Sequence, residues 1–386
     1  MEIICNKKEC VGCTACTNSC PKKAIQMIED ECGFLHPIID QSKCIDCGLC
    51  KKVCPVLNSK SNQSINDCYV GYAKEKIHKE NSSSGGIFPI IAEKILNNKG
   101  IVIGATFDEN NKLIHQAITK KEELIKLKGS KYLQSNLNNI FQFIKDNIEE
   151  KQILFVGTPC QVAGLKSFLR KEYDNLITID LFCHGVPSPK LFSKYVKELE
   201  QKYNEKLINY NFRDKSTGWD TYSNKATFNN SEFKELQSNN DYMKLFLHDV
   251  ALRESCYNCK FKLGNKYSDI TLGDFWGVRN FYPEMYNKEG VSAIIVNTNK
   301  GLEIFNSISN ELTYQTCKLE EILSENHSLE KSAVQTDKRH KFFDEIDHKS
   351  IKKLSNKYSN DISNVIRLKK ILKKLFKIKN NRKAKL

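Results

Sequence analysis

Two short cysteine motifs near the N-terminus constrain this chain more than any other feature. Each has four cysteines at the spacing C-x2-C-x2-C-x3-C followed by proline, over residues 10–21 and 44–55. Three thiolates on one tight loop can reach three metal atoms of one cluster, while the fourth, on the next helical turn, points toward a second cluster. The proline ends that turn because it fixes φ and removes a backbone donor. The chain should therefore begin with a small module built around metal ligands.

Tandem motifs of this kind hold two [4Fe–4S] clusters in bacterial ferredoxins. By position, cluster one takes Cys10, Cys13, Cys16 and Cys54, and cluster two takes Cys44, Cys47, Cys50 and Cys20. A zinc site, the alternative, uses four ligands that usually come as two separated pairs, which does not fit two tandem sets of four. Apolar segments at 24–28 and 34–38 predict a short hairpin, so we expect a ferredoxin-type domain over residues 1–58.

The sequence has 16 cysteines but neither a secretory signal nor an apolar run long enough to span a membrane. We therefore expect a cytoplasmic protein whose thiols stay reduced and serve as metal ligands or reactive groups rather than disulfides.

The formal net charge of +14 is concentrated at the C-terminus. After residue 351 there are thirteen lysines and arginines against one acid, Asp361, so this segment carries +12 and the rest of the chain is nearly neutral. A nearly neutral body argues against a nucleic-acid-binding domain. Apolar residues recur at helical spacing between Val365 and Ile378, so we expect a basic amphipathic tail over 352–386. Such a helix either packs on the body or lies on an anionic membrane surface.

Between these two ends, strands and helices alternate after a polar linker at 59–66. We expect strands at 69–73, 101–107, 153–156 and 176–182, and helices at 87–97, 137–148, 161–170 and 190–203. This alternation predicts an α/β part over 67–185, and a less regular α+β part follows over 186–340, with strands at 207–212, 225–228, 270–272 and 291–296. The predicted fold class is thus a bacterial-ferredoxin-like module fused to a mixed α/β body with a basic C-terminal helix.

The body carries neither the glycine pattern of a Rossmann dinucleotide site nor that of a P-loop. It does carry Ser82-Ser83-Ser84-Gly85-Gly86 directly before the helix predicted at 87–97. Serines and glycines at a helix N-terminus suit a phosphate group, because free N–H groups and the positive end of the helix dipole face it. An ordinary serine N-cap is the alternative.

A second group of four cysteines follows in the body. Cys160 and Cys183 each come directly after a predicted strand, where α/β proteins place their chemistry, and Cys256 and Cys259 form a C-x2-C pair. On converging loops, the four could hold a third cluster or a zinc ion. Separate buried thiols with one redox pair are the alternative.

At these residues the sequence resembles the beta-subunit family of coenzyme F-420 hydrogenases and dehydrogenases, over roughly residues 1–340. The motifs that carry the resemblance are Ser83-Ser84-Gly85-Gly86, 129–135 (GSKYLQS), 157–161 (GTPCQ), 183–186 (CHGV), Cys256-x2-Cys259 and 273–277 (GDFWG). The resemblance implies a flavoprotein that binds FAD outside a Rossmann fold, with a cluster held near the flavin by cysteines of this region.

The resemblance also implies roles for individual residues. Flavin contacts are implied at Ser83, Ser84, Gly85, Gly86, Lys131, Gln134, Asp274 and Trp276, and a proton donor at His184. For His184, a purely structural histidine is the alternative, and for the 273–277 motif it is a strand end that packs its aromatic side chains.

We expect an oxidoreductase that passes electrons between ferredoxin-type clusters, FAD and a small two-electron organic acceptor, or a deazaflavin. Ferredoxin or another low-potential donor would be its partner. The alternative is a subunit of a larger redox complex that transfers electrons but binds no substrate.

Overall fold

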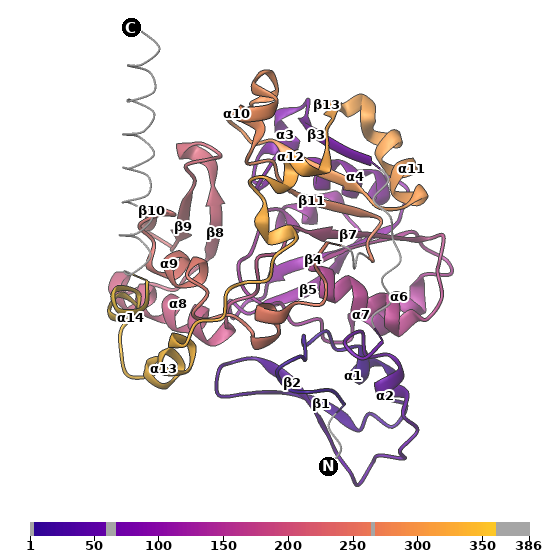
Figure 1. Ribbon diagram of the computed structural model, residues 1–386, viewed down its shortest axis with the longest axis vertical. Coiled ribbons are helices and arrows are strands. Elements are labelled where there is room, and N and C mark those ends of the chain that lie inside the picture. The colour runs from indigo at the N-terminus through magenta and orange to yellow at the C-terminus, as the bar shows by residue number, and fades with distance from the viewer. Residues whose placement is uncertain (1–3, 59–66, 264–266, 360–386) are drawn as a thin grey trace, which may run out of the picture.

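A large mixed sheet forms the centre of the protein (Figure 1). The computed structural model describes residues 4–58, 67–263 and 267–359, so the predicted linker at 59–66 lies outside it. The sheet has the order β13-β3-β12-β11-β7-β6-β4-β5. Its strands are β3 (Asp67–Ala73), β4 (Ile101–Phe107), β5 (Leu113–Ile118), β6 (Ile153–Gly157), β7 (Leu176–Leu181), β11 (Ile270–Asp274), β12 (Ser292–Val296) and β13 (Leu312–Thr316). The predicted mixed α/β fold is confirmed.

Four neighbouring strands of this sheet, β4, β6, β7 and β11, run parallel, and the other pairs are antiparallel. Parallel strands are buried on both faces and are therefore apolar throughout. In β6, Ile153 and Phe155 enter one hydrophobic cluster while Leu154 enters the cluster on the other face. Helices α4 (Ile87–Asn97) and α11 (Asn299–Ile308) cover the Leu154 face, and α6 (Ile140–Asn147) and α7 (Pro159–Leu169) cover the other.

The sheet unites the two predicted parts of the body. Strand β11, from the later part, pairs parallel with β7, and β3 lies between β12 and β13. The α/β part at 67–185 and the α+β part at 186–340 therefore share one sheet.

A second layer packs beside the large sheet. It contains the antiparallel sheet of β8 (Asn209–Asp214), β9 (Ser223–Thr227) and β10 (Glu232–Leu236), with α8 (Pro189–Tyr203), α9 (Asp241–Leu247), α13 (Lys338–Glu345) and α14 (Ile351–Tyr358). Phe192, Phe212 and Tyr242 form its aromatic core. Short helices complete the body: α3 (Lys76–Lys79), α5 (Leu124–Leu127), α10 (Val278–Phe281) and α12 (Leu319–Leu323).

The predicted basic tail is covered only at its start, by α14, because residues 360–386 lie outside the described part of the chain. Within the described residues, no helix has both the length and the apolar character needed to cross a bilayer.

The N-terminal module has the predicted hairpin, formed by β1 (Ile25–Glu29) and β2 (Leu35–Ile39), and two short helices, α1 (Ala15–Ser19) and α2 (Leu49–Lys52). The two cysteine motifs fold alike. Thr14 and Gly48, the residues before α1 and α2, are both left-handed, as are Gly12 and Asp46 two positions earlier. This repeated backbone turn forms the two cysteine loops in the same way.

The module docks against α6 and α7 (Figure 1). Its Cys13 approaches α7 so closely that a Cβ added to Gly164 would lie 2.7 Å from the Cys13 Cβ and 2.9 Å from its Sγ. Only glycine leaves room for this contact. Cys13, Cys16 and Val53 share a hydrophobic cluster with Phe141 and Phe168 of the body, so the module and this face of the sheet have one continuous core.

Candidate functional site

Three parallel strands bring the predicted site residues of the body to one edge of the sheet. The carboxyl ends of parallel neighbours lie at the same edge. Cys160 follows β6, Cys183 follows β7, and Asp274 ends β11. Cys183 and Asp274, which are 91 positions apart in the sequence, thus lie at the ends of neighbouring strands.

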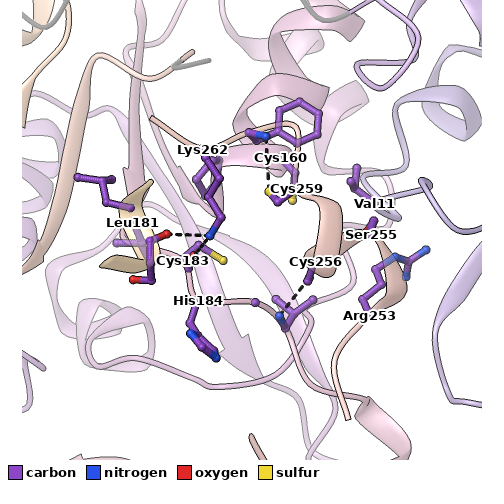
Figure 2. A pocket seen from close by; sticks show the side chains of 16 residues that line it. Val11, Cys160, Leu181, Cys183, His184, Arg253, Ser255, Cys256, Cys259 and Lys262 are labelled. Carbon is purple, nitrogen blue, oxygen red and sulfur yellow. Dashed lines mark hydrogen bonds between the residues drawn. The ribbon is translucent and has the colours of Figure 1, made fainter. Parts of the chain in front are cut away.

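The four cysteines of the second group line a single cavity, which we call the cysteine cavity (Figure 2). Cys160 is in the first turn of α7, Cys183 follows β7, and Cys256 and Cys259 lie in and just after a short 3-10 turn. Two backbone N–H groups point at sulfur: that of Val186 lies 3.5 Å from the Cys256 Sγ, and that of Phe261 lies 3.5 Å from the Cys259 Sγ. N–H groups directed at cysteine sulfur are a common feature of iron–sulfur sites and influence their potential.

The loop after β7 can reach Cys256 because Gly185 has no side chain. Gly185 has a φ of +155°, and a Cβ there would lie 2.9 Å from the Leu252 Cδ1 and 3.3 Å from the Cys256 Cβ. On another side of the cavity, the Lys262 ammonium donates to the carbonyls of Cys183 and Ser328, each at 2.7 Å (Figure 2).

The protonation chemistry of this cavity suits a metal cluster. Burial, followed by the neighbouring Cys183, raises the pKa of Cys256 to about 12, and burial also raises the pKa of Cys160. These two thiols would stay protonated in the metal-free chain, and bound iron would have to displace their protons. Four half-buried cysteines around one cavity, two N–H groups directed at sulfur and a flanking cation fit an iron–sulfur cluster.

Within the described residues, no group of three or more His, Cys, Asp or Glu side chains is close enough together to hold a single metal ion.

In the N-terminal module, cysteines of the two motifs lie together. Cys54 of the second motif lines one cavity with Cys10, Cys13 and Cys16 of the first, as predicted for cluster one. Cys5 lines this cluster-one cavity as well, and its thiol interacts with those of Cys10 and Cys54. The spacing of Cys5 gave no sign of this position, because it lies outside the motif.

The cluster-two cysteines lie nearer the surface. Burial, together with the nearby thiols of Cys47 and Cys20, raises the pKa of Cys50. Cys47 is exposed, and Cys44 begins the same loop. Cys20 also accepts a hydrogen bond from the Ala24 N–H at 3.3 Å. Cys20, from the first motif, therefore lies with Cys47 and Cys50 from the second.

A large cavity of about 460 Å³ adjoins the cysteine cavity. Such a volume is typical of a small-molecule or cofactor site. Of the residues predicted to contact a cofactor, its walls include Ser83, Ser84, Gly86, Lys131, Asp274 and Trp276, and the predicted proton donor His184 lines it too. Cys183, His184, Gly185 and Val186 line both cavities, so the two share one wall.

Lys131 places a cation in the large cavity. Its Nζ donates to the carbonyls of Lys126, at 3.0 Å, and Lys128, at 2.9 Å. No carboxylate among the described residues pairs with it. Burial lowers its pKa to about 7. An anionic group bound nearby would favour the charged form, so the side chain suits a phosphate.

The serine–glycine turn before α4 also forms part of this wall. The Ser83 hydroxyl accepts a hydrogen bond from the Ser130 N–H at 2.6 Å, and the Ser84 hydroxyl donates to the Val291 carbonyl at 2.8 Å. These bonds fix the loop, and its Gly86 and the first turn of α4 face the cavity. Gly85 is not among the lining residues: its N–H bonds the Ser292 hydroxyl, so it packs behind the wall.

A buried ion pair closes another wall. Arg213, whose side chain is 2% exposed, forms two hydrogen bonds with Asp274, at 2.9 and 3.1 Å. Trp219 donates its indole N–H to the same carboxylate at 2.6 Å and stacks on Trp276 with ring centres 4.9 Å apart. Asp274 therefore orients an arginine and an indole at the cavity wall.

His184 lies at the junction of the two cavities. Its Nε2 is 2.5 Å from the Asp249 Oδ1, and the other Asp249 oxygen accepts the Val334 N–H at 2.8 Å. The carboxylate holds the imidazole in one orientation. A histidine that bonds a carboxylate at one ring nitrogen can exchange a proton at the other.

Gln134 does not line the large cavity. Its amide donates to the Val11 carbonyl and accepts from Arg253, both at 2.9 Å, so it joins the body to the N-terminal module. The loop turns between Lys131 and Gln134 and directs their side chains to different sites. Arg213, Arg253 and His115, which also lines the large cavity, were missed because no local pattern marks them.

Comparison with known proteins agrees with this architecture. Residues 9–58 match the family described as "4Fe-4S dicluster domain". Two further matches are to the family described as "Coenzyme F420 hydrogenase/dehydrogenase, beta subunit": residues 68–142 match its N-terminal part, and residues 150–322 match its C-terminal part.

Two relatives come from Methanocaldococcus jannaschii. One is an uncharacterised protein, 24% identical over 342 residues, with 74% of this chain and 89% of the relative covered. The other is a coenzyme F420-dependent sulfite reductase, 26% identical over 311 residues, with 78% of this chain covered. The match spans only 46% of that reductase. Among solved structures, the F420-reducing [NiFe] hydrogenase complex from Methanosarcina barkeri contains a similar chain, with a TM-score of 0.48, 15% identity, and 69% of this chain and 90% of that chain covered.

The Asp274–Arg213 pair gives a test of the cavity wall. We expect Asp274→Ala to lower the free energy of unfolding by about 3–5 kcal/mol, because it leaves a buried guanidinium without its carboxylate. Urea unfolding followed by circular dichroism measures this. As a control, Asp220→Ala removes the partner of Arg279 in a solvent-exposed pair and should change stability little. Equal effects of the two substitutions would contradict this account of the wall.

Proposed function

Since the chain belongs to the coenzyme F420 hydrogenase/dehydrogenase beta-subunit family and carries a 4Fe-4S dicluster domain in front, we propose that it is an iron–sulfur flavoprotein oxidoreductase. Electrons would pass between a low-potential donor such as ferredoxin, three [4Fe–4S] clusters, FAD and a small two-electron acceptor or a deazaflavin.

One observation carries this proposal: the cysteine cavity adjoins the N-terminal cysteine motifs on one side and the large cavity on the other. Val11, which lies between two cluster-one cysteines, lines it from the module, and Cys183 and His184 are shared with the large cavity. Helix α7 links the two cysteine sets. Gly164, which Cys13 contacts, lies four residues from Cys160, or about 6 Å along the helix axis.

The residues of the large cavity fit a flavin nucleotide. Lys131 and the first turn of α4 would bind the phosphates, because both favour negative charge. Trp276 and the Arg213–Asp274 pair would line the remaining wall. Bound FAD would supply the exchange between single electrons and a hydride. The protein would orient it beside Cys183 and exclude water.

His184 would serve as the proton donor of the reaction. Its ring lies at the cavity wall next to Cys183, and Asp249 fixes its orientation. A polar acceptor that receives a hydride also needs a proton, and a histidine held by a carboxylate can supply it.

Cofactor content tests the proposal directly. Anaerobically purified protein should contain about twelve irons and about one FAD per chain. Cys183→Ala should lose about four of these irons, because it removes a ligand of the third cluster. Cys317→Ala, outside the three cysteine sets, should keep them all. About eight irons in the wild type would exclude the third cluster, and a protein without flavin would contradict the proposal as a whole.

FAD affinity should depend on pH through Lys131. Its pKa of about 7 lies below the usual value of a lysine, so above pH 7 the free side chain is mostly neutral. Binding of the phosphates above pH 7 then requires that Lys131 take up a proton. Affinity should therefore fall as pH rises from 7 to 9, by up to about tenfold per unit. Lys131→Met should bind more weakly and without this pH dependence, as titration of the flavin-free protein would measure. Lys128→Met, on the same loop, should keep the pH dependence of the wild type. A wild-type affinity that stays constant across this range would contradict the role of Lys131.

Turnover by the purified single chain separates an enzyme from an electron-transfer subunit. We expect reduced ferredoxin to reduce coenzyme F420 in the presence of this chain alone, because donor site, clusters and flavin site would lie in one polypeptide. Loss of deazaflavin absorbance under anaerobic conditions measures the rate. Reduced protein that reoxidises only when a second polypeptide is added would support the alternative, a subunit that binds no substrate.

A further inference from the structure

Arg253 is a buried cation without an acidic partner. It is 2% exposed and ranks among the largest fully buried side chains of the protein. Its guanidinium donates to the Cys10 carbonyl from Nε at 2.7 Å, to the Leu35 carbonyl from Nη2 at 2.9 Å and to the Gln134 amide oxygen from Nη1 at 2.9 Å. All three acceptors are neutral. Within the residues that the structure describes, no carboxylate forms an ion pair with it.

The surroundings of Arg253 supply no compensating charge by themselves. Both ring nitrogens of His36 lie near its Nη2, Nδ1 at 3.4 Å and Nε2 at 3.5 Å, and the same Nε2 is 3.2 Å from the Asp30 carboxylate. Asp30 also pairs with Lys7, so its charge is already shared. A charge removed from water and left without a partner is strongly unfavourable. The position therefore calls for an anionic group that is bound when the protein functions.

Two cysteine sites flank this cation. Arg253 lines the cysteine cavity together with Val11 and Cys256, and Figure 2 shows it beside Ser255 and Cys256. On the other side it bonds the backbone of Cys10, and a Cβ added to Gly12 would lie 3.0 Å from its Nη1. The guanidinium therefore lies between the two cysteine sites. One guanidinium thus acts on a ligand of cluster one and on a ligand of the third cluster.

We propose that Arg253 is the shared counter-cation of cluster one and the third cluster, and that it raises the reduction potentials of both; this inference rests on the clusters assigned in the proposed function. A [4Fe–4S] cluster with four thiolate ligands is anionic and gains a further negative charge on reduction. A nearby cation stabilises the reduced form more than the oxidised form, so the potential rises. Because it acts on both clusters, Arg253 keeps their reduction potentials close and so aids electron transfer from one cluster to the other.

Gln134 offers a way to cancel this charge without removing Arg253. Gln134→Glu has nearly the same shape and still accepts from Arg253, but it places a carboxylate 2.9 Å from the guanidinium. Gln134→Met is the uncharged control: like Gln134→Glu it loses the hydrogen bond to Val11, and it also gives up the bond from Arg253, whose charge it leaves uncancelled. Arg253→Lys keeps the charge while removing part of the hydrogen bonding, so it separates charge from geometry.

The experiment is an anaerobic redox titration of the cluster-loaded chain, followed by electron paramagnetic resonance. In Gln134→Glu, the ratio of reduced to oxidised cluster one and third cluster at a fixed potential should fall about tenfold relative to Gln134→Met, which is about 59 mV for a one-electron couple. Cluster two is the internal reference and should stay unchanged. Arg253→Lys should keep all potentials near those of the wild type.

Equal potentials in Gln134→Glu and Gln134→Met would overturn the proposal, and so would an equal shift of all three clusters, because a general change of environment would then explain it. Iron content tests the proposed function separately. A wild-type protein with about eight irons lacks the third cluster, and the role of Arg253 is then decided by the shift of cluster one alone.

Discussion

The parallel pairing of β6, β7 and β11 is the constraint on which the site depends. Neighbouring parallel strands end at one edge, so the loops that carry Cys160, Cys183 and Asp274 must meet there. The Cys256–Cys259 pair then completes the cysteine cavity. It comes from the segment between β10 of the small sheet and β11 of the large sheet. The large cavity opens beside the same edge. One feature of sheet topology therefore places the four cysteines and the large cavity in contact.

Much of the fold was predictable because its signals are local. Helices α4 and α8 and strands β4, β6 and β7 were found within a few residues, since each has an apolar periodicity of its own. Strands β5 and β13 were missed. Both lie at the edges of the sheet and mix polar with apolar residues, as in Leu113–Ile118. The strand order was not predictable either, because β3 lies between two strands that come more than 200 residues later, and no local pattern encodes such pairing.

The residues of the candidate site were also predictable only where the sequence carries a local signal. The cluster-one cysteines were predictable because metal geometry fixes their spacing, and the structure brings Cys54 to the other three. For Gln134, the expected flavin contact depended on a side-chain direction that only the folded loop determines, and the side chain bonds the N-terminal module instead. Arg253 gave no signal at all. Its role arises from a contact with Cys10 across 243 positions of sequence, which exists only once the module has docked.

Cations that bond only neutral oxygens line these cavities, and they link cofactor binding to stability. Lys131, Lys262 and Arg253 each donate to carbonyl or amide oxygens, whereas Arg213, in the cavity wall, has the carboxylate of Asp274. A cation that has a carboxylate partner needs no bound ligand to balance its charge. For the three others, an anionic cluster or phosphate bound in the cavity would supply the missing negative charge. A ligand that binds only the folded state stabilises it by mass action. The charges that suit these cavities to anionic cofactors therefore also make the folded chain depend on them.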